Sequence, residues 1–174
     1  MDVRRWRRAD DAEDQEDAWD SQWGGGLQFY GAAGAPPDNR PLFRTPHQAL
    51  EDAVVSIVNQ ERAKHELGRL RIEERLRTSA RLHSRDMAEH EFFNHVTPEG
   101  VTPDQRMVAA GYLLPAAENI AIYGLDPLGV MRAWMNSPPH RVNILRPLVR
   151  CIGVGIHQDP HEPIAWWTQN FGYL

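Results

Sequence analysis

The chain has 174 residues, a hydrophobic fraction of 41% and a formal net charge of −5. This length suffices for one domain with an ordinary core, and the modest hydrophobic fraction indicates an additional polar segment. The negative charge argues against nucleic acid as a partner and against electrostatic binding to an anionic membrane, because the chain has no excess of lysine and arginine to neutralise phosphate groups.

The N-terminal 44 residues differ in character from the rest. Four arginines precede an acidic run that reaches Asp20, and stretches rich in Gly, Ala and Pro follow. Such composition buries too little surface to offset chain entropy. We therefore expect residues 1–44 to be a disordered or loosely docked polar segment and residues 45–174 to form the domain. The segment could also recruit a partner through its aromatic side chains, which are Trp6, Trp19, Trp23, Phe29 and Tyr30.

The N-terminus does not read as an export signal. Its arginines are followed by acidic residues from Asp10 onward rather than by a hydrophobic region. We therefore expect a cytoplasmic protein, or a secreted one if a leader precedes this sequence in the natural chain. No stretch is long and apolar enough to span a bilayer. The single cysteine, Cys151, excludes an internal disulfide and lies in an apolar alternation typical of a buried strand.

The first helix of the domain is predicted to begin at Thr45, which would cap it in a capping box with Gln48. It would end at Gly68, a residue suited to a left-handed cap. The second helix is expected over residues 74–91. On it, His83 falls on the apolar face, which is typical of a core histidine rather than a ligand.

Two more helices and three strands complete the predicted domain. One helix begins with a capping box at Thr102 and ends at Gly111, and the other begins at Asp126. Strands are expected at residues 118–123, 150–157 and 164–171. Because this order lacks the regular rhythm of a doubly wound sheet, we expect an α+β fold in which helices cover a central, mainly antiparallel sheet.

Three residues in separate segments carry the chemistry: His95, Glu118 and His140. Two imidazoles and a carboxylate are the protein ligands of several catalytic zinc sites, which leave a fourth position for water. Alternatively, Glu118 orients one imidazole, which then acts as a general base near neutral pH, with Ser137 as a hydroxyl in reach. The same residue types also occur in buried polar clusters that tie helices to a sheet.

A resemblance runs through an ordered set of segments from about Ala49 onward, namely 58–62, 80–87, 93–95, 117–121, 134–145, 152–155 and 167–172. With these segments the chain resembles a bacterial CAP-superfamily (SCP-like) domain. The resemblance implies a three-layer α/β/α sandwich with a cleft whose floor carries a His-Glu-Glu-His tetrad. His95, Glu118 and His140 match three tetrad positions, whereas Ser137 stands where animal and plant members have the second glutamate. The disulfides of animal members are absent.

With this resemblance we expect a ligand-binding module whose cleft takes a small lipid-like, peptide or glycan ligand. A weakly held divalent metal such as Zn²⁺ would lie between His95, Glu118 and His140. One alternative is an enzyme that uses these three residues for metal-assisted hydrolysis or for acid-base chemistry on a small molecule in a biosynthetic pathway. Another is an interaction protein with a vestigial pocket. Four further residues are expected at the ligand site: Ser137, Arg141, Asn119 and Trp134.

Overall fold

The computed structural model of the chain describes residues 45–159 and 161–174. The expected polar segment, residues 1–44, lies outside the described residues. Within them the chain forms five helices and four strands. In chain order these are α1 (Gln48–Lys64), β1 (Arg71–Ile72), α2 (Glu74–Glu89), α3 (Pro103–Ala109), β2 (Pro115–Tyr123), α4 (Pro127–Asn136), α5 (Pro138–Ile144), β3 (Cys151–His157) and β4 (Ala165–Gly172).

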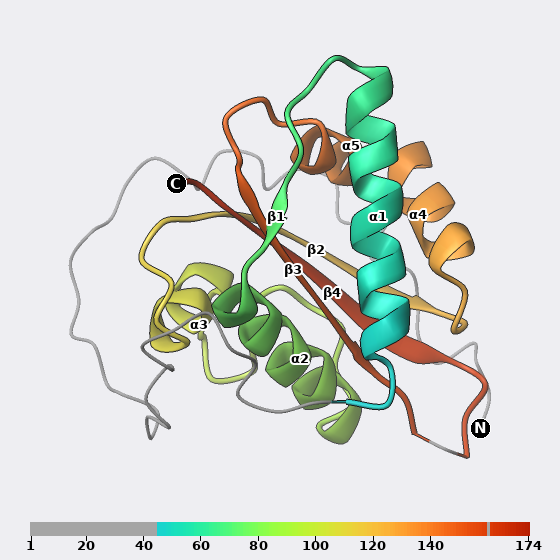
Figure 1. Ribbon diagram of the computed structural model, residues 1–174. Coiled ribbons are helices and arrows are strands. Elements are labelled where there is room, and N and C mark those ends of the chain that lie inside the picture. Colours follow the sequence, from blue (N-terminus) through green and yellow to red (C-terminus); the bar gives the residue numbers. More distant parts are fainter. Residues whose placement is uncertain (1–44, 160) are drawn as a thin grey trace.

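The elements form three layers around one sheet. The strand order is β1-β3-β4-β2, and both β3 and β2 pair with β4 in antiparallel fashion, while β1 adds a short parallel edge. Helices α2 and α3 cover one face of the sheet, and α1, α4 and α5 cover the other (Figure 1). The predicted α+β sandwich with a mainly antiparallel sheet is confirmed.

The two faces of the sheet differ in chemistry. Side chains of a strand alternate between its faces, so Ile152, Val154 and Ile156 of β3 all point toward α1 and α4. They join the main hydrophobic core, which also contains Trp134 and Trp167. The opposite face, toward α2, is built largely from small and polar residues, namely Glu118, Gly153, Gly155, Thr168 and Asn170.

Two glycines set how closely α2 packs on the sheet. A Cβ atom built on Gly153 would lie 2.1 Å from the backbone nitrogen of Arg77, and one on Gly155 would lie 2.2 Å from that of Arg81. Both neighbours are helix backbone and cannot move aside as a flexible side chain could. Helix α2 therefore rests directly on the β3 backbone, an approach that only glycine allows.

A buried ion pair joins α1 and α2. Glu51 of α1 is completely buried and accepts a hydrogen bond of 2.9 Å from Nε of Arg81, which is itself buried in α2. A charge withdrawn from water needs a partner of this kind, since an unpaired one would be strongly destabilising. Since α1 and α2 lie on opposite faces of the sheet, this pair ties the two helical layers together.

The expected start and end of α1 are wrong. The helix begins at Gln48 with His47 as its N-cap, and no side chain caps it; Thr45 instead donates a hydrogen bond of 3.4 Å to the Glu51 side chain. The helix ends at Lys64, and Glu66, rather than Gly68, adopts the left-handed conformation. The position of the helix is set by tertiary contacts rather than by local capping, because Glu51 and Arg62 are buried and bonded to other parts of the fold.

Other local signals are confirmed. Thr102 and Gln105 form the predicted capping box at α3, Gly111 has the positive φ of a helix-ending glycine, and Asp126 caps α4. Two elements were not predicted. Strand β1 has only two residues, too few to show a pattern in the sequence. Helix α5 begins with Pro138 and Pro139, which fit the first turn of a helix, but the helix is too short to show a clear apolar periodicity. None of the helices in the described residues has the length and apolar character needed to cross a membrane.

We predict that Gly153→Ala lowers the free energy of unfolding by about 3 kcal/mol, because its Cβ would force α2 off the sheet. The measurement is urea unfolding followed by circular dichroism. Gly68→Ala is the matched control, since nothing lies within 4 Å of its added Cβ, and we expect a change within about 0.5 kcal/mol. Equal effects of the two substitutions would contradict the close packing of α2.

Candidate functional site

The site is organised around the carboxylate of Glu118, on β2. Its side chain points to the α2 and α3 face of the sheet and is 1% exposed. Oε1 accepts hydrogen bonds from Nδ1 of His95 at 2.9 Å and from Nη2 of Arg106 at 3.0 Å, and Oε2 accepts from the same Nη2 at 2.8 Å. In the orientation that turns its nitrogen toward the carboxylate, the Asn170 amide donates to Oε2 at 3.1 Å. Both oxygens are thus fully used.

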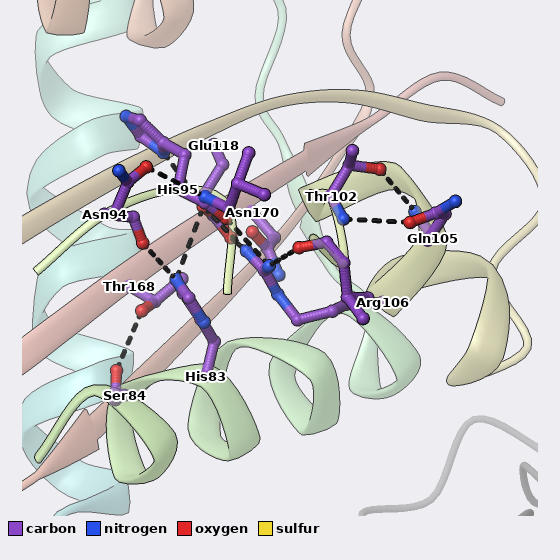
Figure 2. Close-up of polar contacts among 12 residues, drawn as sticks. His83, Ser84, Asn94, His95, Thr102, Gln105, Arg106, Glu118, Thr168 and Asn170 are labelled. Carbon is purple, nitrogen blue, oxygen red and sulfur yellow. Dashed lines mark hydrogen bonds and ion pairs between the residues drawn. The ribbon is translucent and has the colours of Figure 1, made fainter. Parts of the chain in front are cut away.

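Arg106, on α3, connects this carboxylate to the loop that carries His95. Its Nη1 donates to the backbone oxygens of His95, at 2.8 Å, and of Val101, at 3.0 Å. One guanidinium therefore holds the Glu118 carboxylate and both ends of the 95–101 loop (Figure 2). The planar fork of arginine suits such simultaneous contacts.

Glu118 is ionised in this setting. Burial alone would raise the pKa of its carboxyl, but the hydrogen bond from His95 and the charge of Arg106 outweigh burial and hold that pKa below its ordinary value. An ionised carboxylate only accepts hydrogen bonds, so Nδ1 of His95 must carry the proton that they share.

His95 is the exposed member of this group. Its side chain is 45% exposed, while its Nδ1 is committed to the buried Glu118. Among the described residues the second ring nitrogen, Nε2, has no hydrogen-bond partner. With the proton on Nδ1, the neutral ring has a free lone pair on Nε2 that can accept a hydrogen bond or remove a proton.

His83 of α2 lies behind His95 and is completely buried. Its Nε2 donates a hydrogen bond of 3.1 Å to the backbone oxygen of Asn94 and lies 3.8 Å from the Glu118 carboxylate. Burial lowers the pKa of His83 to about 4, although the charge of Glu118 acts to raise it. His83 is therefore a neutral core histidine, as expected, and it positions the residue next to His95.

His140 lies on α5, whose backbone is docked on the other face of β2. Its Nδ1 shares a hydrogen bond of 2.8 Å with Oγ of Ser137, the residue that precedes α5. Asn119 follows Glu118 and points to the opposite face, where its Nδ2 donates to the backbone oxygen of His140 at 3.1 Å. Asn143 donates to Asn119 Oδ1 at 2.9 Å, so α5 is docked on β2 by these amides.

The remaining residues expected at the ligand site divide into buried and accessible ones. Trp134 is buried, and its Nε1 donates to the backbone oxygen of Ile120, so it belongs to the core. Asn119 is also completely buried and hydrogen-bonded at both ends of its amide. Arg141 is exposed, and Ser137 is half-buried beside His140.

The residues present do not fit the expected metal. Within the described residues, no three His, Cys, Asp or Glu side chains form a group that could hold a metal ion. The Glu118 carboxylate already receives its donors from His95, Arg106 and Asn170, and the guanidinium would repel a second cation. A metal between His95, Glu118 and His140 would have to displace this network.

An open groove lies elsewhere on the molecule. It has a volume of about 410 Å³ and runs along β1 beside α1. Its lining does not include His95, Glu118 or His140; it consists of Val55, Asn59, Arg69, Leu70, Arg71 and Ile72. This groove and the polar groups around Glu118 therefore lie in different parts of the described residues.

Three residues that contact Glu118 were not assigned to the site from the sequence: Arg106, Asn170 and His83. Arg106 lies in a short helix among several exposed charges, and nothing in its spacing distinguishes it. Asn170 was hidden in an apolar strand pattern. Asn170 could have been found from the pairing of the two strands, because residues 118 and 170 lie opposite each other in β2 and β4 and must share a face of the sheet.

Comparison with known proteins gives a consistent answer. Residues 55–171 match the sequence profile of CAP, the Cysteine-rich secretory protein family. The chain is 41% identical over 124 residues to the uncharacterized protein YkwD of Bacillus subtilis (strain 168), a match that covers 71% of this chain and 47% of YkwD.

Two solved structures share the fold. An extracellular protein containing a SCP domain from Bacillus anthracis str. Ames superposes with a TM-score of 0.67 and 26% identity, covering 75% of this chain and 44% of that one. An outer surface protein from Borrelia burgdorferi gives a TM-score of 0.65 at 22% identity, covering 74% of this chain and 96% of that one. This chain thus spans less than half the length of YkwD and of the B. anthracis protein.

The expected cytoplasmic location is wrong. The B. anthracis relative is an extracellular protein, and the matching family is described as secretory. The expectation came from the arginines and acidic residues near the N-terminus. Export is directed by a short segment that the folded domain does not need, so the domain's relatives are the better guide to compartment.

The buried His83 predicts a pH dependence of stability. Its folded pKa of about 4 lies below the ordinary value of 6.5, so the unfolded chain binds the proton more readily. This stabilising contribution is complete above pH 6.5 and is lost as the pH falls toward 4. Between pH 7.5 and pH 4.5 the free energy of unfolding should fall in both proteins. We expect the fall in His83→Gln to be about 2–3 kcal/mol smaller than in the unsubstituted chain. Urea unfolding at both pH values tests this, and parallel losses would show that His83 is not buried and neutral.

Proposed function

Because this chain belongs to the CAP family, the cysteine-rich secretory protein family, we propose that it is an extracellular module that binds a small polar ligand, a glycan or a short peptide, at the surface around His95. The B. anthracis relative described as extracellular supports the location. The proposal concerns this domain and not the activity of the full-length relatives, since this chain spans less than half of the length of YkwD and of the B. anthracis protein.

One observation carries the proposal: a solvent-accessible imidazole is fixed in position by a fully buried charge. Side-chain entropy is lost when a free histidine binds a ligand, but His95 is already held by Glu118. Glu118 is in turn held by Arg106. Such support behind an exposed polar group is the arrangement that binding sites use to gain affinity and orientation.

The ligand is expected to be polar because the accessible groups are polar. Besides His95, polar groups are carried by α5, with His140 and Arg141, and by Ser137 just before it; this helix is docked on Asn119, the residue after Glu118. Imidazole, hydroxyl and guanidinium groups match the hydroxyls of a glycan or the amides of a peptide. This polarity favours such ligands over the lipid-like one that we also considered.

A second candidate function is catalysis by the same pair. A carboxylate that orients the Nδ1–H of a histidine leaves Nε2 as a general base, as in many hydrolytic enzymes. Ser137 is bonded to His140 and not to His95, so the obvious hydroxyl is not activated by this base. We therefore rank binding above catalysis.

We predict that a panel of soluble oligosaccharides and short peptides contains a ligand that shifts the ring resonances of His95 in the ¹⁵N-labelled full chain. His95→Ala should weaken its binding at least about tenfold, the cost of a hydrogen bond to a fixed group. His90→Ala is the matched control, because His90 is an exposed histidine away from Glu118. A panel ligand that binds the His95→Ala variant with unchanged affinity would refute a site at His95.

The variant His95→Gln separates the two candidate functions. Glutamine can still offer a hydrogen-bond acceptor near the position of Nε2, but it cannot act as a base. A binding module should keep most of its affinity in this variant and leave the ligand chemically unchanged in a mass spectrum. If the protein is an enzyme, the unsubstituted chain should convert the ligand, and the His95→Gln variant should show no conversion.

A further inference from the structure

We propose that Arg106 stands in the place of a metal cation beside Glu118 and fixes His95 as a hydrogen-bond acceptor, so that the site takes ligands with hydroxyl or amide N–H donors and binds no metal ion. This inference rests on the proposed function, since it names the ligand chemistry of the same site. Its evidence is the set of contacts that Arg106 makes.

The first contact is between charges. Nη2 of Arg106 lies 3.0 Å and 2.8 Å from the two oxygens of Glu118, so a permanent positive charge sits against the whole carboxylate. The pair is shielded from solvent, with Arg106 only 11% exposed and Glu118 only 1% exposed. The negative charge of Glu118 is therefore balanced without a metal and without a charged His95.

The second contact is with the backbone. Nη1 of Arg106 donates to the carbonyl oxygens of His95 and Val101. Within the loop, the Thr97 backbone and hydroxyl bond to Val101, which closes the turn between them. The same guanidinium thus fixes the backbone of His95 and the carboxylate that its ring contacts. Turning the ring would move Nδ1 away from Glu118 and break the hydrogen bond of 2.9 Å between them.

The proton position follows from this arrangement. Glu118 is ionised and can only accept, so the proton of the shared hydrogen bond is on Nδ1 of His95. A neutral ring with its proton at this position presents the lone pair of Nε2 on its exposed side. A ligand hydroxyl or amide N–H can donate to this lone pair, whereas the oxygen of an anion would meet another electron pair.

A metal ion is disfavoured at the same place. It could reach Nε2 of His95, but Glu118 would not complete its coordination because both carboxylate oxygens are bonded to other donors. The fixed charge of Arg106 would also oppose a second cation. Substitution of Arg106 by an uncharged residue removes the opposing charge and takes one hydrogen-bond donor from each oxygen of Glu118.

Two measurements on the full chain test the inference. Long-range ¹H–¹⁵N NMR spectra report which ring nitrogen of His95 carries the proton at pH 7.5. Calorimetric titration with Zn²⁺ alone reports metal binding in every variant, including those without the His95 ring. In the unsubstituted chain we expect a single tautomer with the proton on Nδ1 and no Zn²⁺ binding that depends on His95. In Arg106→Gln we expect loss of the single tautomer and Zn²⁺ binding that His95→Ala abolishes.

Arg85→Gln is the matched control, because Arg85 is exposed on α2 and its ion-pair partner, Glu89, is not part of the site. It should behave like the unsubstituted chain. A proton on Nε2 of His95, or binding of Zn²⁺ to the unsubstituted chain that His95→Ala removes, would overturn the inference even if Arg106→Gln failed to fold. Neither measurement uses a ligand, so failure to find a glycan or peptide would count against the proposed function alone.

Discussion

A single buried carboxylate connects most of the elements on the α2 face of this protein. Glu118 comes from β2, and its partners come from α3, from β4 and from the loop after α2, while His83 of α2 lies just beyond hydrogen-bond distance. Withdrawing a carboxylate from water costs several kcal/mol unless its charge and lone pairs are matched. The chain can fold with Glu118 inside only when all of these partners are in place, so one charge fixes the position of His95.

The packing of α2 explains why such a charge can be buried beside a sheet. Gly153 and Gly155 let the helix backbone contact β3 directly, and this leaves little space between helix and sheet for large apolar side chains. Short polar residues occupy that face instead, as shown by Ser84, which donates to Thr168 across the interface. A polar layer of this kind can accommodate Glu118, whereas the hydrophobic layer under α1 could not.

The fold was largely predictable because its signals are local or repeat along an element. The capping box at Thr102, the cap at Asp126 and the alternation in β3 each depend on a few neighbouring residues. The start of α1 and the two-residue β1 were not predictable, since Glu51 and the pairing with Cys151 act over long sequence distances. In the site, His95 and Glu118 could be named from the sequence, but Arg106 could not, because its role depends entirely on which carboxylate it meets.

Glu118 and Asn119 show how one strand can serve both structure and function. They are consecutive, so their side chains leave β2 on opposite faces. Asn119 is hydrogen-bonded at both ends of its amide and is closed off from solvent, which makes it a fastening between β2 and α5. Glu118 is equally buried, but one of its partners is an exposed ring. Among the described residues that hydrogen-bond to Glu118, His95 is the one whose side chain reaches the surface. Exposure at that one ring, rather than the presence of histidine and glutamate, is the observation that supports the proposed binding role of this side of the cluster.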